Sequence, residues 1–139
     1  MVDPRGPRFG AAVTTVVLAL ALVLMGTAAG TVLVAWQTLV FGLGALVGLH
    51  AQPYGVLFRR VVRPRLAPPA EMEDAAPPRF AQAVGLLFMV VALIALLAGS
   101  TIVATVAVAF ALAAAFLNAA FNFCLGCEMY LLVARLRHS

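Results

Sequence analysis

Apolar residues fill two long stretches of the chain, and charged residues are confined to the segments around them. No Asp, Glu, Lys or Arg occurs between Phe9 and Phe58 or between Phe80 and Cys127. Because one bilayer crossing takes roughly 20 apolar residues, each stretch is long enough to cross twice. Clusters of glycine, alanine and hydroxyl residues divide the stretches near residues 25–31 and 98–101. Each stretch is therefore predicted to form a helical hairpin.

These divisions predict four transmembrane helices within an all-α membrane protein. The expected bounds are residues 9–25, 31–50 and 80–97, with a fourth helix near residues 102–123. The first stretch is longer than the roughly 7–15 residues of a signal-peptide core, which favours a retained helix over a cleaved leader. We expect residues 1–139 to form a single membrane domain.

The two apolar stretches begin alike, which indicates an internal duplication. The tripeptide Pro-Arg-Phe stands at residues 7–9 and again at 78–80, and the same spacing aligns Asp3 with Asp74. Two helices return the chain to its starting side, so duplicated hairpins would share one orientation. The prediction is a tandem parallel repeat.

The predicted repeats are joined and flanked by polar segments. We expect repeat 1 at about residues 3–66 and repeat 2 at about residues 74–137, each a hairpin followed by a short basic interfacial segment. A Pro-rich, acidic linker is expected at about residues 64–78, and Pro53 is expected to end or kink the second helix.

Composition strengthens the membrane assignment and sets its orientation. The chain is 65% hydrophobic and 10% charged, with a mean hydropathy of +1.10, which favours a lipid bilayer over nucleic acid as its partner despite the basic charge. The net charge of +4 comes entirely from arginines that flank the apolar stretches. The positive-inside rule therefore predicts a multi-pass protein of the inner (cytoplasmic) membrane with both termini inside.

Polar side chains interrupt the apolar stretches, and three amides are the candidates for a role inside the membrane. Gln37 lies in the second expected helix, and Asn118 and Asn122 stand four residues apart in the fourth, which would put both on one helical face. Amides in hydrocarbon are costly unless paired, so hydrogen bonds between helices are the simpler explanation. A small polar pathway through the membrane is the alternative.

Both cysteines fall in one motif, Cys124-Leu125-Gly126-Cys127-Glu128, where the fourth helix leaves the membrane. Cysteines at this spacing can close a disulfide ring, and a thiolate near a helix N-terminus reacts readily. If Gly126 interrupts the helix, the pair lies at the start of a new one; if the helix continues, Cys124, Cys127 and Glu128 share a face. Two buried, inert cysteines are also compatible with the pattern.

Metal and cofactor chemistry have weaker support. Two thiolates leave a tetrahedral zinc site two ligands short, and His50, His138 and Glu128 are the residues that could complete it. We therefore assign neither a metal nor a cofactor. Cys124, Cys127 and Glu128 are the candidate catalytic residues, with Glu128 tuning the pair.

The motif, together with Pro-Arg-Phe before both hairpins and Pro53-Tyr54-Gly55 after the first, resembles a family of small four-helix bacterial membrane proteins of unknown function. The resemblance covers nearly the whole chain, and Cys-Leu-Gly-Cys-Glu is its most specific part. Members are often encoded near thioredoxin-like and rhodanese-like sulfurtransferase proteins, so the resemblance implies thiol or sulfur chemistry with such a partner. It carries no assigned reaction.

Three functions follow as hypotheses. The first is a thiol–disulfide or sulfur relay, in which Cys124 or Cys127 attacks a partner's disulfide or persulfide and the other cysteine resolves the product. The second is a small transport or channel-like component lined by Gln37, Asn118 and Asn122. The third is a non-catalytic anchor that recruits a cytosolic protein. Whether the protein is an enzyme stays open at this stage.

Overall fold

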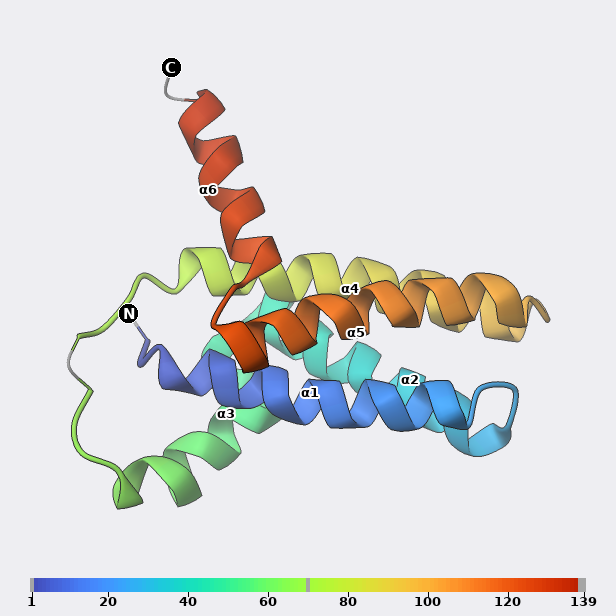
Figure 1. Cartoon of the computed structure of the whole chain (residues 1–139), viewed down its shortest axis with the longest axis horizontal. Coiled ribbons are helices and arrows are strands. Elements are labelled where there is room, and N and C mark those ends of the chain that lie inside the picture. Colours follow the sequence, from blue (N-terminus) through green and yellow to red (C-terminus); the bar gives the residue numbers. More distant parts are fainter. Residues whose placement is uncertain (1, 70, 138–139) are drawn as a thin grey trace.

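The computed structural model describes residues 2–69 and 71–137, and their regular structure is almost entirely helical (Figure 1). Four long helices form a bundle, and shorter helices leave it at one end. The helices are α1 (Arg5–Val23), α2 (Ala28–Gly42), η1 (Leu43–Val47), η2 (Leu49–Ala51), α3 (Pro53–Leu57), η3 (Phe58–Val62), η4 (Arg63–Arg65), α4 (Ala76–Leu97), α5 (Thr101–Phe121) and α6 (Leu125–Arg137).

Four helices in the described part of the chain are long and apolar enough to cross a membrane, which confirms the predicted number. They are Arg5–Val23, Ala28–Val47, Ala76–Leu97 and Thr101–Phe121. The turn between α1 and α2 and the turn between α4 and α5 lie at one end of the bundle, whereas the start of α1, the linker and α6 lie at the other (Figure 1). A multi-pass membrane protein is the arrangement that these spans suggest.

The core of the bundle is narrow and rich in small side chains. Leu18, Val34, Met89 and Val108 are fully buried, one from each long helix. Alanines between them, such as Ala92 and Ala104, allow close approach of the helices. In addition to the two hairpin pairings, α1 packs against α5 and α2 against α4. Most large apolar side chains point outward, as expected where lipid replaces water.

Both hairpins start earlier than the sequence predicted. α1 begins at Arg5 and α4 at Ala76, each before its Pro-Arg-Phe tripeptide. The first turn of α4 includes Pro77 and Pro78, because proline fits the first helical turn, where its missing N–H has no intrahelical acceptor. The expected linker at residues 64–78 is therefore shorter than its composition indicated.

The second helix ends earlier than its expected bound at His50. A π-helical turn follows α2, and Gly48 then adopts φ 142°, a conformation that L side chains rarely reach. Arg79 closes this end, since its Nε donates to the carbonyl of Ala45 at 2.9 Å. Pro53 does not kink the helix: it opens α3 after the break.

The fourth helix also stops short, at Phe121 instead of residue 123. Asn122 takes a left-handed conformation (φ 53°, ψ 33°) and turns the chain out of α5, which asparagine tolerates better than most residues. Arg8 Nε donates to the carbonyl of Ala119 at 3.1 Å at this end. Asn122 thus lies at the C-cap, just past the helix that carries Asn118, and its N–H donates to the carbonyl of Asn118 at 3.1 Å.

Candidate functional site: the cysteine turn before α6

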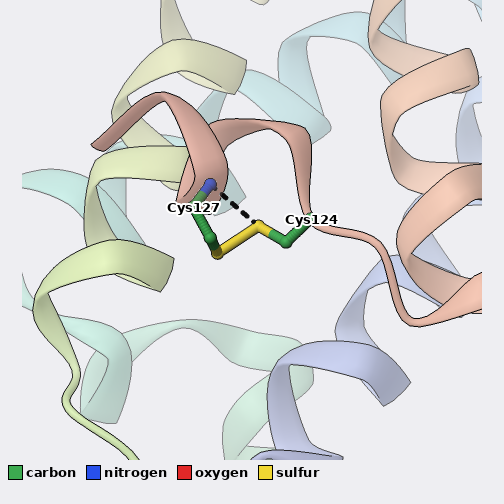
Figure 2. The surroundings of a disulfide bond; sticks show 2 residues. All are labelled: Cys124 and Cys127. Carbon is green, nitrogen blue, oxygen red and sulfur yellow. Dashed lines mark hydrogen bonds between the residues drawn. A yellow bond between two sulfur atoms is a disulfide. The ribbon is translucent and has the colours of Figure 1, made fainter. Parts of the chain in front are cut away.

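Cys124 and Cys127 are joined by a disulfide where the chain enters α6 (Figure 2). Cys124 directly precedes the helix, and Cys127 lies in its first turn. The backbone N–H of Cys127 donates to Sγ of Cys124 at 3.1 Å, and the N–H of Glu128 donates to the carbonyl of Cys124 at 3.0 Å. Cys124 thus acts as the N-cap of α6, with sulfur replacing the usual oxygen acceptor.

The local sequence explains why a new helix begins here. The left-handed Asn122 ends α5 and α6 starts at Leu125, so the break comes before the cysteines and not at Gly126, which lies inside α6. Gly126 lets the first turn of α6 approach α4 closely: a Cβ at this position would lie 2.6 Å from Cα of Ala81. Tyr130 then packs on Phe80, with ring centroids 5.7 Å apart.

The pair lies at a solvent-accessible edge of the protein. Both cysteines are half-buried, and Glu128 in the first turn of α6 is exposed. Arg135 and Arg137 are in the last turn of α6, about 12 Å along the axis from Cys127 at 1.5 Å per residue. The described charge nearest in sequence to the pair is therefore the carboxylate of Glu128, whereas both arginines lie at the far end of the helix.

This arrangement places one sulfur of the pair against the N-terminus of α6. A thiolate on Cys124 would keep the N–H of Cys127 as a donor and would face the partial positive charge of the α6 N-terminus. Both effects favour negative charge on that sulfur. Sγ of Cys124 is therefore the sulfur that faces the helix N-terminus, and Cys127 lies three residues further on.

The alternative metal site does not assemble in the described residues. Within residues 2–69 and 71–137, no three His, Cys, Asp or Glu side chains gather closely enough to hold an ion. His138, one of the candidate ligands, lies outside the described residues. His50 follows the break after α2, in the other half of the chain from the cysteines.

The intramembrane polar residues are not brought together. Gln37 is fully buried, where its Nε2 donates to Oγ1 of Thr14 at 3.3 Å and its Oε1 accepts from the hydroxyl of Tyr54 at 2.8 Å. Trp36 Nε1 donates to the same hydroxyl at 2.9 Å. Burial raises the pKa of Tyr54, which keeps the phenol protonated as a donor. Asn118 and Asn122 lie at the end of α5 and take no part in this network.

Sequence reasoning missed two sets of polar contacts. The first is the pair of Gln37 partners, Thr14 and Tyr54, which come from two different elements and carry no shared motif. The second joins Gln52 to Gln82: Nε2 of Gln52 donates to Oε1 of Gln82 at 2.8 Å, and its own Oε1 accepts from the N–H of Gly55 at 3.0 Å. A signal for Gln52 existed, because a polar residue before proline is typical of a helix start.

The family comparison agrees with the extent of this fold. A family model described as "Domain of unknown function (DUF4395)" matches residues 2–135. The chain belongs to the DUF4395 family. The DUF4395 match spans the four apolar helices and includes the cysteine turn, so bundle and motif belong to one family unit. No curated protein and no solved structure matches the chain.

Proposed function

We propose that the protein exchanges thiols and disulfides through Cys124 and Cys127 at one face of the membrane. The observation that carries this proposal is the bonded pair at the start of α6, half-buried and with the Cys127 N–H directed at Sγ of Cys124. A bond across three residues closes too short a loop to stabilise the fold much, because that stabilisation grows with loop length. Exchange chemistry explains the pair better than a structural role.

The exchange conserves atoms and electrons without a further co-reactant. In the reduced protein, the Cys124 thiolate attacks one sulfur of a partner disulfide, and the second partner sulfur leaves as a thiolate. The Cys127 thiolate then attacks Sγ of Cys124, which re-forms the internal disulfide and releases the partner as a dithiol. Two electrons pass from this dithiol to the partner, and the same steps in reverse oxidise a dithiol partner.

A thioredoxin-like protein is the partner that this chemistry fits best, and a rhodanese-like sulfurtransferase would act through a persulfide at the same sulfur. Arginines flank the apolar stretches at the end of the bundle where α6 emerges, which favours a cytoplasmic position for the pair. Cytoplasmic thiols are normally kept reduced, so a bond on that side would be cycled and not permanent.

We also propose that the bundle is a tandem parallel repeat, which puts the cysteine turn in the second of two related units. Equivalent contacts support it: Phe9 packs on Phe58 as Phe80 packs on Tyr130, each pair with ring centroids 5.7 Å apart. Arg8 and Arg79, one from each tripeptide, both donate to a carbonyl near the end of the other unit's second helix. Because two parallel units both start on the side of the N-terminus, a reporter inserted between residues 66 and 69 should report a cytoplasmic location.

Mixed-disulfide trapping in cells tests the exchange. The Cys127→Ser variant retains the attacking sulfur but cannot resolve, so it should accumulate a partner adduct that disappears on reduction and is identified by mass spectrometry. Cys124→Ser is the matched control, because it keeps one thiol in the same turn without the favoured nucleophile. It should trap far less.

Two results would refute the mechanism. Equal trapping by both single variants would show non-specific oxidation of any thiol in this turn. Thiols that resist alkylation in folded, reduced protein and react only after denaturation would leave a structural role as the only explanation of the pair.

A further inference from the structure

A second polar site lies in the first half of the chain, apart from the cysteine turn. A cavity of about 220 Å³ opens beside α3, between the N-terminal segment, the break after α2 and the start of α4. Since one water takes about 30 Å³ of liquid volume, the cavity has room for several waters or one small tetrahedral anion. The lining residues with polar side chains are Asp3, His50, Gln52, Arg59, Arg63 and Gln82.

Two guanidinium groups give this cavity its positive charge. Arg59 and Arg63 lie four residues apart in the helical segment after α3, and both line the cavity. Arg59 Nη2 donates to the carbonyl of His50 at 2.7 Å, and no carboxylate in the described residues lies within ion-pair distance of it. Arg63 reaches Asp3 only through Nε, at 3.7 Å. Most guanidinium N–H donors thus remain available.

The one carboxylate of the lining is occupied by another residue. Asp3 accepts from Nε and Nη2 of Arg5 at 3.1 and 2.9 Å, and from the Arg5 backbone N–H at 3.0 Å. These bonds from Arg5 hold the pKa of Asp3 below its ordinary value of 3.8. Arg5 therefore occupies most of the acceptor positions of Asp3, and the two arginines against one carboxylate leave the lining with net positive charge.

The rest of the cavity suits an anion held at a lipid interface. Leu49, Phe58 and Met72 form apolar walls, which lower the local dielectric and strengthen ionic hydrogen bonds. The N-terminal segment is fixed across the linker by paired backbone bonds between Val2 and Glu73 of 2.7 and 2.8 Å. The cavity is thus a formed part of the fold at the arginine-rich end of the bundle.

We propose that this cavity binds a phosphate group, with Arg59 and Arg63 as its cationic ligands. Guanidinium pairs match the planar, two-oxygen edge that phosphate presents, which makes arginine the preferred residue for such sites. The phosphate belongs either to an anionic phospholipid headgroup or to a soluble phosphate, because basic pockets beside membrane helices recognise both. This site does not depend on the cysteine exchange.

Binding to the full chain in lipid nanodiscs tests the proposal. In zwitterionic phosphatidylcholine discs, inorganic phosphate is titrated by calorimetry against chloride at equal ionic strength. In a second arm, phosphatidylglycerol is added and the retained lipid is counted by native mass spectrometry. The variant is Arg59→Gln with Arg63→Gln, and the matched control is Arg60→Gln with Arg65→Gln, which removes equal charge from the same segment outside the cavity lining.

The cavity variant should weaken binding of one of the two probes by about tenfold or more, because each lost charged hydrogen bond is a large share of the affinity. The control should change it less than about twofold, as expected for exposed charge alone. Loss in the phosphate arm identifies a soluble ligand, and loss only in the lipid arm identifies a headgroup. Equal loss in both variants, or no binding of either probe to the parent protein, would overturn the proposal. If the double variant loses helicity, Arg59→Gln alone is used, since its side chain is exposed.

Discussion

Two turns of the molecule start a helix with the same kind of hydrogen bond, from a backbone N–H to the side chain of the preceding cap residue. Before α3, Oε1 of Gln52 accepts from the N–H of Gly55 at 3.0 Å; before α6, Sγ of Cys124 accepts from the N–H of Cys127 at 3.1 Å. Each turn follows a membrane-spanning helix and starts a shorter helix that leaves the bundle (Figure 1). In both, a side chain satisfies an N–H that the new helix cannot pair internally.

The turns differ in how firmly the surrounding structure holds them. Gln52 is buried and bonded to Gln82, and Phe58 in the helix that follows is only 2% exposed. By contrast, none of the described α6 residues is fully buried. The first turn is fixed by buried neighbours, whereas the second contacts the bundle through partly exposed residues, with Gly126 against Ala81 and Tyr130 on Phe80. The proposed exchange suits the less constrained of the two turns, because a partner must reach its sulfurs.

The largest effect is expected at the cysteine turn, where loss of the sulfurs should change the exchange rate far more than the stability. Replacing both cysteines with serine should lower the rate of thiol exchange at least about 100-fold, since no sulfur remains to form a bond. Stability should fall by no more than about 2 kcal/mol, because the loop is short. Exchange with a fluorescent disulfide probe and thermal unfolding in detergent measure the two. A large loss of stability would indicate a structural disulfide instead.

The close approach of α6 to α4 provides the next test. In Gly126→Ala, the added Cβ would meet Cα and Cβ of Ala81 at 2.6 Å, so backbone must move, at about 1–3 kcal/mol. We expect α6 to detach, which should lower the unfolding temperature and speed alkylation of the reduced cysteines.

Gly55→Ala is the matched control in the other turn. Its new Cβ would lie 3.3 Å from the carbonyl oxygen of Leu49, a contact that a small shift relieves, so the change should stay below about 1 kcal/mol. Ala81→Gly should rescue Gly126→Ala only in part, because it removes the clash with Cβ of residue 81 and leaves the clash with its Cα. No rescue at all would show that the backbone contact, and not the Ala81 side chain, limits the approach of α6.

The number of helices could be predicted from the sequence, because composition alone specifies a membrane span. The residues at which the helices end could not. Gly48 ends the π-helical turn after α2, and Asn122 ends α5, both with positive φ angles. Neither residue is distinctive in an apolar stretch that already contains glycines and amides. Pro77 and Pro78 were predicted to lie in the linker, but proline is equally compatible with the first turn of a helix. The cysteine motif was visible, whereas its N-cap geometry depended on where α5 ended.

Polar contacts of the first turn were beyond sequence reasoning for a different reason. Gln82 meets Gln52 across the bundle, and Tyr54 meets Gln37, from elements whose relative positions depend on packing. From the sequence, Arg59 is one of several arginines in the predicted basic interfacial segment. Its position at a cavity follows only from the break at Gly48 and the fold of residues 2–7 over α3.

Removing the cap of the first turn should give a moderate effect. Gln52→Ala loses the acceptor for the N–H of Gly55 and the bond to Gln82, which should cost about 1–2 kcal/mol by analogy with other N-caps. Thiol exchange should be unchanged, because the cysteines lie in the other half of the chain. Thermal unfolding and the fluorescent disulfide assay on the same preparation measure both. A parallel loss of exchange would mean that the two turns are coupled.

The smallest effect concerns the N-terminal segment that covers the first turn. The bonds from Arg5 lower the pKa of Asp3 in the folded protein below the ordinary 3.8, so the carboxylate stabilises the fold wherever it is ionised. This contribution is complete above pH 3.8 and is lost as the pH falls through the folded-state pKa. For an ion pair near the surface we expect less than about 1 kcal/mol. Asp3→Asn should therefore lower stability at pH 7 but make the acid limb of the unfolding curve shallower than in the parent. If the two proteins lose stability identically between pH 5 and pH 2, Asp3 does not fix this segment, and the first turn owes its rigidity to the glutamine pair alone.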